Sequence, residues 1–225
     1  MIAIIAAMDL ERDALKQHLE DSKHLTISGI EFDQGHIGNQ EVVLMLSGVG
    51  KGYAALSTTI LLEHFPISQI INIGTAGGIR PEEQILDIVV STKVVQHDFD
   101  TSAIDGTAGI GLHFEADQTL IDSFEKAMST LDCHVFTGQI ASGDRFVVSG
   151  PKMDEITTTF PEALCCEMEA GAIAQVAAHY QKPFVIIRSL SDVACYPDSH
   201  MDFPVYAKKA SERSALFVSE VIRNL

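Results

Sequence analysis

The sequence predicts one α/β domain, in which a central mixed, largely parallel sheet lies between two layers of helices. Short apolar runs alternate with segments of helical periodicity along all 225 residues, the order typical of strand–helix–strand units. Several runs are apolar throughout, as expected of strands that are buried on both faces. No repeat, low-complexity tract or linker interrupts the alternation, and the length suits one large domain. We therefore expect residues 1–225 to form a single three-layer α/β/α sandwich.

The first hundred residues contain most of the expected strands. We expect a strand at 2–7, a helix with Leu10, Ala14, Leu15, His18 and Leu19 on one side, paired strands at 30–37 and 41–46 around the turn "GNQ", a helix at 51–65, and strands at 69–74 and 87–92. Pro66 ends the second helix because proline cannot continue the backbone hydrogen-bond pattern.

The rest of the chain repeats the alternation. We expect a helix in 117–131 with Leu120, Ile121, Phe124, Ala127, Met128 and Leu131 at helical spacing, a strand at 134–141, a helix beginning near Glu169 with Ile173, Val176 and Tyr180 on the same apolar face, a strand at 183–190, and a last helix that buries Ala210, Ser214, Phe217 and Val221.

The composition excludes several classes of partner. The formal charge of −16 at pH 7 argues against nucleic acid and anionic membranes, because both attract basic patches. It also argues against a naked polyphosphate as the substrate. The apolar N-terminus "MIAIIAAM" is short and has no basic flank, so we expect neither a signal peptide nor a membrane span there.

The four cysteines indicate a reducing compartment. Cys133, Cys165, Cys166 and Cys195 form no CxxC pair and show no zinc-ligand spacing. The adjacent pair at 165 and 166 is poorly placed to form a disulfide with itself. We expect reduced, mostly buried thiols in a cytoplasmic protein.

Polar residues with possible functions follow several expected strands. Glu11 comes shortly after the first strand, "SGVGKG" after "EVVLML", "TAGG" after "IINIG", "SGDRF" after "GQIA", and Asp192 after "PFVIIRSL". In an open α/β sheet, ligands bind at the carboxyl ends of the strands. The sequence therefore predicts a ligand site at this edge.

Two motifs suggest ligands but match no known pattern. "SGVGKG" (47–52) resembles a phosphate cradle, yet it lacks the first glycine and the Ser or Thr of a P-loop and the third glycine of a dinucleotide fingerprint. Taken alone, it is read as a tight turn between a strand and a helix. "HDFD" (97–100) could bind a metal, but no second histidine cluster supports this, and a structural loop is favoured.

The stretch "CCEMEAG" (165–171) places Glu167 and Glu169 on either side of one methionine. The two carboxylates could simply complement the dipole of the helix that follows. Alternatively, an inward-pointing Glu169 could accept both hydroxyls of a sugar diol, since a buried carboxylate needs hydrogen-bond donors. The stretch alone leaves both readings open. In "RSLSDVA" (188–194), Arg188 and Asp192 could form an ion pair or a helix cap, but a functional Asp192 is favoured.

Taken together, the motifs resemble a known family. "AAMDLE", "SGVGKGYAA", "NIGTAGG", "ASGDRF", "CEMEAGAIA" and "RSLSDVA" occur in the order and spacing of the nucleoside phosphorylase and nucleosidase superfamily. Within it, the chain looks like the 5′-methylthioadenosine/S-adenosylhomocysteine nucleosidases over nearly its whole length. The resemblance implies a homodimer with no cofactor and no metal. It also implies hydrolysis of the N-glycosidic bond of 5′-methylthioadenosine, S-adenosylhomocysteine and 5′-deoxyadenosine, which releases adenine.

The resemblance also assigns roles to residues. Asp192 matches the general acid that protonates adenine N7, and Glu11 matches the residue that orients and deprotonates the attacking water. Thr75 and Arg188 would help to hold that water. Such roles suit glycoside cleavage, which passes through an oxocarbenium-like state with an acid on the leaving group and a base on the water. The acid would need a raised pKa.

The remaining matches concern substrate binding. Glu169 would bind the ribose 2′- and 3′-hydroxyls, with Met168 against the sugar and Glu167 close by. Phe146 and Val147 would stack on adenine and read its edge. The residues that would line the ribose and 5′ side are Met8, Val49 and either Phe203 or Tyr206.

The chain departs from the family pattern around the 5′ group. The family has a long aromatic loop after its "HDAD" motif, which helps to form the pocket for the 5′ tail across the dimer interface. Here the corresponding loop contains "TSAIDGTAGIG" (101–111), which has three glycines and no aromatic residue. We expect the loop at 97–111 to lie near the partner's site and to discriminate weakly among 5′ groups. Thr75 also stands where the family usually has Ser.

Two other enzymatic functions compete with this one. A purine nucleoside phosphorylase of the same fold would bind phosphate through an Arg where this chain has Asn72, and it would have a second Arg in the glycine loop. Their absence is unfavourable for phosphate binding. A nucleosidase for a futalosine-type adenosine derivative differs only in the tail. A binding protein without activity would not require Glu11 and Asp192 together.

Overall fold

A computed structural model describes residues 1–127, 134–196 and 198–225. Its strands are β1 (Ile2–Ala6), β2 (Glu20–Ile27), β3 (Ile30–Ile37), β4 (Gln40–Leu46), β5 (Gln69–Gly78), β6 (Ile88–Asp100), β7 (Ile110–Glu115), β8 (Val135–Ser142), β9 (Ala163–Glu167) and β10 (Phe184–Val193). Its helices are α1 (Asp9–Lys16), α2 (Lys51–His64), α3 (Ser102–Asp105), α4 (Gln118–Ala127), α5 (Pro151–Thr159), α6 (Ala170–His179) and α7 (Phe203–Arg223), with short 3₁₀ turns at Gly106–Gly109 and Ser199–Met201.

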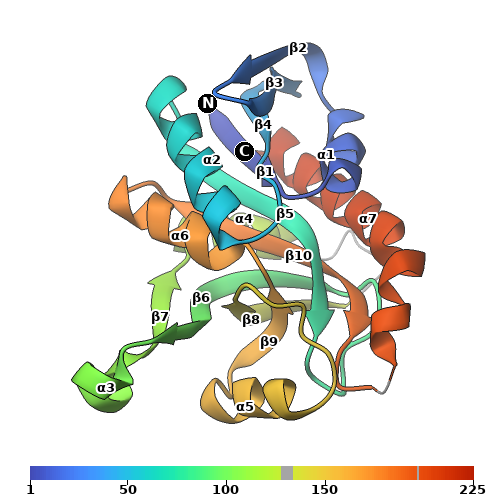
Figure 1. The fold of residues 1–225 in the computed structure, drawn as a ribbon. Coiled ribbons are helices and arrows are strands. Elements are labelled where there is room, and N and C mark those ends of the chain that lie inside the picture. Colours follow the sequence, from blue (N-terminus) through green and yellow to red (C-terminus); the bar gives the residue numbers. More distant parts are fainter. Residues whose placement is uncertain (128–133, 197) are drawn as a thin grey trace.

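All ten strands belong to one sheet, part of which closes on itself. The order is β10-β6-β8-β9-β5-β1-β4-β3-β2, with β7 paired to β6, and β10 also pairs with β5. Strands β10, β6, β8, β9 and β5 therefore form a closed ring, which β1 to β4 extend as an open wing (Figure 1). The sheet is mixed. Its centre is parallel, with β1 between β4 and β5 and β10 beside β5.

Helices cover both faces of the open part of the sheet (Figure 1). Side chains on β1 alternate between the two layers, as the two-residue period of a strand requires. Ile2 and Ile4 pack in the core beneath α1, α4 and α7, whereas Ala3 and Ile5 pack in the core beneath α2 and α6. This arrangement confirms the predicted α/β fold class with helices on both sides of the sheet.

Most of the predicted elements are present, although several have different limits. The antiparallel pair β3–β4 and the end of α2 at His64 agree with expectation. Helix α1 ends at Lys16, so His18 and Leu19 lie beyond it. Strand β5 continues to Gly78. Of the helix predicted in 117–131, which is α4 in the structure, Met128 and Leu131 lie outside the described residues.

Three expectations were wrong. "HDFD" is not a loop, because β6 continues to Asp100, with β7 and β8 pairing along its length. The sheet is not simply open, because β10 closes the ring. The buried side of α6 carries Ile173 with alanines at 170, 174 and 177, whereas Val176 and Tyr180 are only half-buried. Strands β2, β7 and β9 and helix α5 were not anticipated.

Two of the three described cysteines are buried, as the sequence predicted. Cys165 and Cys166 are free and buried, and Cys195 is free and half-buried. Burial raises the pKa of the Cys165 and Cys166 thiols well above the ordinary value, so both stay protonated. Cys133 lies outside the described residues. None of the helices within the described ranges has the length and apolar character needed to span a bilayer.

Candidate active site

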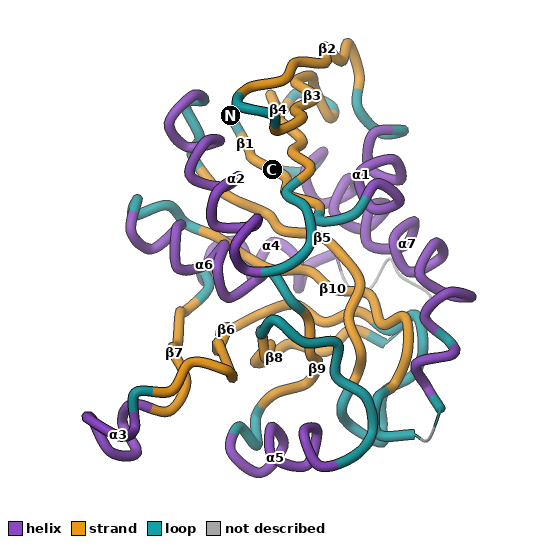
Figure 2. Tube along the Cα trace, viewed as in Figure 1, coloured by secondary structure: helices purple, strands orange, loops and turns teal. Residues whose placement is uncertain are grey.

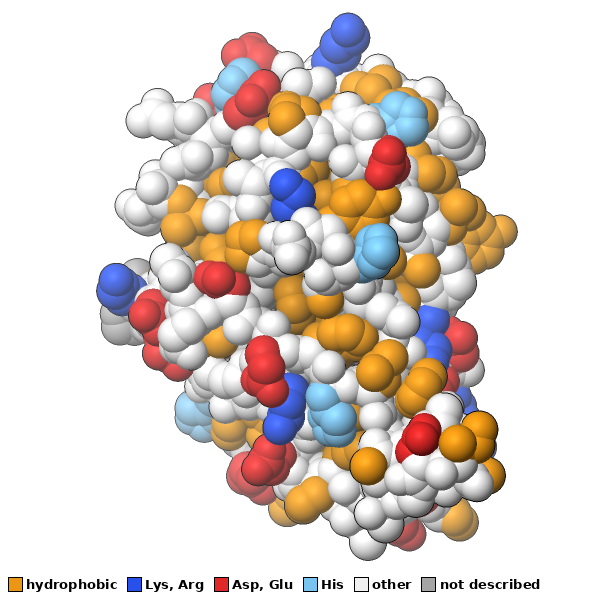
Figure 3. All heavy atoms as spheres, turned by 90° about the vertical axis from the view of Figure 1, so that its left-hand side faces the viewer, with side chains coloured by type: hydrophobic (Ala, Val, Ile, Leu, Met, Phe, Trp, Pro, Cys, Tyr) orange, Lys and Arg blue, Asp and Glu red, His pale blue; other side chains and the backbone are white. Residues whose placement is uncertain are grey.

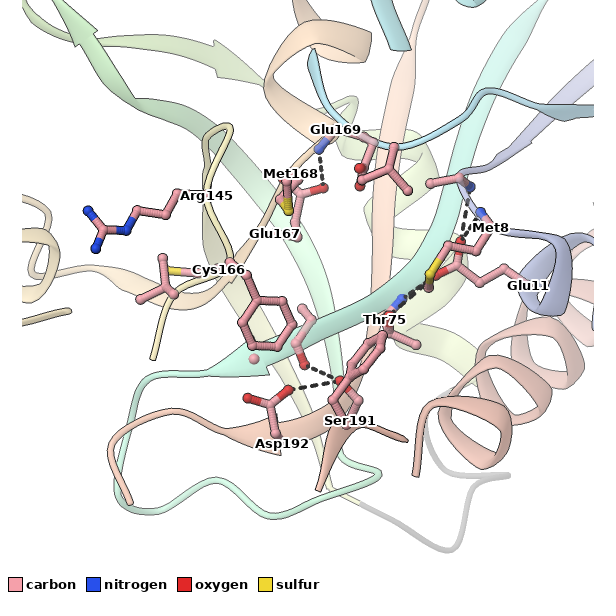
Figure 4. A pocket seen from close by; sticks show the side chains of 17 residues that line it. Met8, Glu11, Thr75, Arg145, Cys166, Glu167, Met168, Glu169, Ser191 and Asp192 are labelled. Atoms are coloured by element: carbon pink, nitrogen blue, oxygen red, sulfur yellow. Dashed lines mark hydrogen bonds between the residues drawn. The ribbon is translucent and has the colours of Figure 1, made fainter. Parts of the chain in front are cut away.

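One pocket opens where six strands end, and segments far apart in the sequence line it (Figure 4). Its walls come from the carboxyl ends of β1, β4, β5, β8, β9 and β10, the edge at which the sequence predicted a ligand site. The lining residues are Ala7, Met8, Glu11, Val49, Thr75, Ala76, Gly77, Arg145, Phe146, Val147, Cys166, Glu167, Met168, Glu169, Ser191, Asp192 and Phe203. Of the predicted site residues, the structure leaves only Arg188 out of this lining.

Glu11 lies in the first turn of α1 and is held by backbone amides. Its Oε2 accepts hydrogen bonds from the N–H groups of Ala7 and Met8, both at 3.0 Å. Its Oε1 accepts from Thr75 N at 3.0 Å and from Thr75 Oγ1 at 3.3 Å. The side chain thus has a fixed orientation between β1 and β5. Burial raises the pKa of Glu11, although the positive charge of Arg188 and these amides oppose the shift. A raised pKa makes a carboxylate a stronger base.

Gly74 allows Glu11 and Arg188 to approach each other. A Cβ atom on Gly74 would lie 3.1 Å from Glu11 Oε1 and 3.4 Å from Arg188 NH1. The glycine in "IINIG", which lies within β5, is therefore needed for this close approach.

Arg188 lies behind the pocket on β10, with only 1% of its side chain exposed. Its NH2 donates to Asn72 Oδ1 and to Glu167 Oε2, both at 2.6 Å. Arg188 therefore lies outside the pocket lining, where its guanidinium contacts Glu167, one of the carboxylates that line the pocket.

Glu167 and Glu169 have different environments, although one residue separates them. Glu167 Oε2 accepts from Glu169 N at 3.0 Å and from Ala170 N at 2.8 Å, which are free amides at the start of α6. Together with the ion pair to Arg188, these bonds give Glu167 the helix-capping role that the sequence left open. Its Oε1 is buried and has no hydrogen-bond partner among the described residues.

Glu169 is the more available carboxylate. Its Oε1 accepts a 2.8 Å hydrogen bond from Gly50 N, which joins the end of β9 to the loop after β4. Burial first, and then the negative charge of Glu167, raise the pKa of Glu169 to about 7. A buried carboxylate of this kind gains from additional donors such as sugar hydroxyls.

Asp192 lies at the end of β10, on the opposite side of the pocket from Glu11 (Figure 4). It is 1% exposed, and its Oδ1 accepts a 2.9 Å hydrogen bond from Ser191 Oγ. A Cβ atom on Gly77 would lie 3.0 Å from Asp192 Oδ2, so the first glycine of "TAGG" leaves room for this carboxyl group. Asp192 lies within a strand and therefore does not cap a helix.

Apolar side chains close the rest of the pocket. The rings of Phe146 and Phe203 meet edge to face with centroids 5.5 Å apart. This contact links the loop after β8 to the start of α7, and Figure 2 shows that long loop in teal. Val147 is buried below Phe146. Of the two candidates for the 5′ side, Phe203 lines the pocket, whereas the Tyr206 ring lies near Lys209 Nζ.

Sequence reasoning missed six lining residues: Ala7, Ala76, Gly77, Arg145, Cys166 and Ser191. Five of them directly adjoin predicted residues, and Gly77 is two residues from Thr75, so their place could have been extrapolated. Arg145, which adjoins Phe146 and belongs to "SGDRF", differs from the others in its exposure. It is exposed, and Figure 4 shows its guanidinium pointing away from the carboxylates.

No group of three or more His, Cys, Asp or Glu side chains within the described part of the chain is arranged to hold a metal ion. In "HDFD", the buried His97 ring faces Gly143, and Asp98 pairs with Lys51 instead. Glu11, Asp192 and Glu169 each approach the same cavity from a different strand end.

Proteins of known family match the whole chain. A model of the phosphorylase superfamily matches residues 1–223. A 5′-methylthioadenosine/S-adenosylhomocysteine nucleosidase of Psychromonas ingrahamii is 42% identical over 230 residues, which cover 100% of this chain and 99% of that protein.

Solved structures agree in fold. The 5′-methylthioadenosine/S-adenosylhomocysteine nucleosidase of Neisseria meningitidis, in complex with methylthio-immucillin-A, matches with a TM-score of 0.94 at 34% identity, covering 100% of this chain and 99% of that one. The futalosine hydrolase of Helicobacter pylori matches with a TM-score of 0.93 at 27% identity, covering 100% and 97%. The chain therefore belongs to the phosphorylase superfamily and, within it, to the family of the 5′-methylthioadenosine/S-adenosylhomocysteine nucleosidases.

Proposed function

We propose that the protein hydrolyses the N-glycosidic bond of 5′-methylthioadenosine, S-adenosylhomocysteine and 5′-deoxyadenosine, giving adenine and the 5-substituted ribose. The observation that carries this proposal is the meeting of Glu11, Asp192 and Glu169 in one pocket. An acid, a base and a sugar clamp are the groups that glycoside hydrolysis requires. The activity of the family supports the same reaction, which suits a cytoplasmic enzyme of methionine salvage.

Each carboxyl group takes one role in the mechanism. Asp192 donates a proton to adenine N7, so that the base leaves as a neutral molecule. Glu11 accepts a proton from the attacking water, whose oxygen forms the new bond to the anomeric carbon. Thr75 supports this step, because its N–H and hydroxyl fix Glu11 Oε1. Negative charge on Glu169 also stabilises the positive charge that develops on the ribose.

Apolar residues hold the two ends of the substrate. Phe146 and Val147 bind adenine, while Met8, Val49 and Met168 contact the ribose and Phe203 covers the 5′ side. Arg188 acts through Glu167 and Glu11. No cofactor or metal enters the mechanism.

The structure gives little support to phosphorolysis. Asn72 occupies the position at which a phosphorylase has its phosphate-binding Arg. Its amide donates to Ile5 O at 2.9 Å and its Oδ1 accepts from Arg188, so the side chain is already used within the core. Arg145 is a cation at the pocket wall that the sequence reasoning had not included, but it points away from Glu11.

One assay separates the candidate functions. The purified protein is incubated with 5′-methylthioadenosine, with and without phosphate, and the sugar product is identified. Free 5-methylthioribose formed at the same rate in both samples supports hydrolysis, whereas the 1-phosphate would establish a phosphorylase. A parallel sample with futalosine tests the hydrolase represented by the Helicobacter pylori structure.

We also propose a homodimer that forms through the face carrying α2 and the β6–α3 segment. Large apolar side chains are exposed there, among them Val49 at 52%, Tyr53 at 62%, Leu56 at 53% and Ile104 at 87%. Figure 3 shows apolar groups along this face. The loop at 97–111 contributes nothing to the pocket of its own chain, which suits a position near the partner's site. Sedimentation velocity of the purified protein measures the oligomeric state.

Substitution of the proposed sugar clamp should separate nucleoside binding from adenine binding. Glu169→Gln removes a charged acceptor, and such hydrogen bonds contribute roughly 1.5–3 kcal/mol. We expect KM for 5′-methylthioadenosine to rise about 10- to 100-fold, while the Ki of adenine, which has no hydroxyls to lose, stays nearly constant. Equal weakening of both ligands would contradict the clamp.

The same variant should change the pH dependence of stability. The pKa of Glu169 is about 7 in the folded protein and 4.5 ordinarily. The stabilisation that this side chain provides is therefore fully present below a pH of 4.5, the ordinary pKa, and is lost as the pH rises through about 7. The melting temperature of Glu169→Gln relative to the wild type should therefore be higher at about pH 8.5 than at about pH 5. A difference that does not depend on pH would argue against the raised pKa.

The protein should accept substrates with different 5′ groups at similar catalytic efficiency. The loop at 101–111 folds into α3 and a 3₁₀ turn with no aromatic side chain, so it can bury little apolar area against a tail. We expect kcat/KM for 5′-methylthioadenosine, S-adenosylhomocysteine and 5′-deoxyadenosine to lie within about two decades. Steady-state kinetics on the three substrates tests this, and a much stronger preference for one of them would refute it.

A further inference from the structure

Two charged residues from motifs noted in the sequence have no part in the proposed chemistry, yet the structure brings them together. Lys51 of "SGVGKG" and Asp98 of "HDFD" form an ion pair, with 2.6 Å between Nζ and Oδ1. Lys51 Nζ also donates to Gln96 Oε1 at 3.1 Å. Neither Lys51 nor Asp98 lines the pocket.

The position of Lys51 is unfavourable for its own helix. It is the first residue of α2, whose first turn contains no acidic residue. A positive charge at this end opposes the helix dipole, and only 20% of the Lys51 side chain is exposed. Helix stability therefore does not explain a lysine at this position, whereas the contacts with β6 do.

Asp144 joins the ion pair from a third segment. Its Oδ1 accepts a 2.7 Å hydrogen bond from Lys51 N, and its own N–H donates to Asp98 Oδ2 at 3.0 Å. A Cβ atom on Gly50 would lie 3.1 Å from Asp144 Oδ1, so the glycine makes room for this contact. We call Lys51, Asp98 and Asp144 the brace.

Asp98 is ionised in this arrangement. Burial alone would raise its pKa, but the hydrogen bonds from Lys51 Nζ and Asp144 N outweigh burial and hold the pKa of Asp98 below its ordinary value. Its two oxygens therefore reach two different loops as charged acceptors, which form stronger hydrogen bonds than neutral ones.

The loops joined by the brace carry different sides of the pocket. The loop after β4 contains Val49 and Gly50, whose N–H reaches Glu169 on the sugar side. The loop after β8 contains Phe146, two residues beyond Asp144, on the base side. The first loop has positive φ angles at Gly48 and Gly50, of 81° and 91°. Glycines give a loop many alternative conformations, so contacts outside the loop are needed to fix its position.

We propose that the brace is a positioning group that holds the sugar side of the pocket at a fixed distance from the base side. It touches no substrate and acts through Gly50 and Phe146. An intact nucleoside must contact both sides at once, so a pocket with fixed spacing binds it with less loss of loop entropy. Adenine alone contacts one side. The inference rests on the proposed nucleosidase function.

Lys51→Met tests the proposal, because it removes the charge while keeping much of the apolar stem. We expect KM for 5′-methylthioadenosine to rise about tenfold more than the Ki of adenine, with the protein still folded by its melting curve. Lys51→Arg, which keeps a cation within reach of Asp98, should restore most of the nucleoside affinity. Lys93→Met is a matched control on the same strand as Asp98, since Lys93 pairs with the exposed Glu162 at 3.4 Å. It should leave both constants unchanged.

A second variant keeps the test decisive. Asp98→Asn weakens the same ion pair from its other end, and the double variant with Lys51→Met should lose little more than either single variant, because both remove the connection between Lys51 Nζ and Asp98 Oδ1. Equal changes in KM and Ki, or no change in either, would overturn the proposal. Additive losses in the double variant would overturn it as well. A wild-type protein that fails to hydrolyse 5′-methylthioadenosine would instead reject the nucleosidase function, and the inference with it.

Discussion

Asp192→Asn should lower kcat for 5′-methylthioadenosine by about 10²- to 10⁴-fold, the usual contribution of a general acid. The amide keeps the size of the side chain and can still accept the 2.9 Å hydrogen bond from Ser191 Oγ. It cannot act as the general acid, because an amide N–H is far too weakly acidic to transfer a proton to adenine N7, whereas a carboxylic acid can do so and become a carboxylate. The affinity for adenine should change far less than kcat, and the melting temperature should stay close to that of the wild type.

A substrate with a better leaving group distinguishes the acid from a merely structural group. A p-nitrophenyl riboside with the same 5′ substituent leaves as a stable anion and needs no proton. The Asp192→Asn variant should therefore retain most of the wild-type activity on it. Asp122→Asn, at an exposed position on α4, provides a matched control that should behave as wild type. Near-wild-type turnover of 5′-methylthioadenosine by Asp192→Asn would remove Asp192 from the mechanism.

Glu11→Gln should abolish most hydrolysis, again by about 10²- to 10⁴-fold in kcat. The amide cannot take a proton from water. It can accept hydrogen bonds through one atom only, so either the amides of Ala7 and Met8 or the Thr75 group would face an NH₂. We therefore expect a modest decrease in melting temperature together with retained adenine binding. The removal of a buried charge offsets part of the loss.

The pH profile supplies a second measurement for Glu11. Burial raises its pKa, so the ionised base is lost at a higher pH than for an ordinary glutamate. In the wild type, kcat should fall on the acidic side as Glu11 becomes protonated, and the residual activity of Glu11→Gln should lack this limb. Glu11 would be mainly structural if the variant unfolded but its remaining folded fraction kept the wild-type kcat.

The sequence was informative wherever a function depends on a strand end. Glu11 could be located because it closely follows the fully apolar run "IAIIAA", and Asp192 because it closely follows the strand that begins with "FVII". The glycines at 74 and 77 could be noticed but not explained, because their reason is the approach of side chains from distant segments.

Elements stabilised by distant pairing could not be predicted. Strand β2 is polar and mostly exposed, with no apolar alternation, and its pairing with β3 determines its conformation. Strand β9 has only five residues and depends on β8 and β5. In "HDFD", local composition favoured a loop, but β6 continues through this segment as a strand, and Asp100 pairs with Ile110 of β7.

The closed ring of strands has a consequence for the order in which the protein becomes functional. Strand β5 lies between β1, which is synthesised before it, and β10, which is synthesised long after it. Until β10 arrives, the edge of β5 that carries Thr75 and Gly77 has no neighbour on that side, and an open edge invites pairing with other chains. Contacts between segments so far apart in sequence also form slowly. The segment that contains β10 therefore supplies Asp192, completes the ring and covers that edge when it pairs with β5. A nascent or truncated chain without this segment has an aggregation-prone strand edge and no activity.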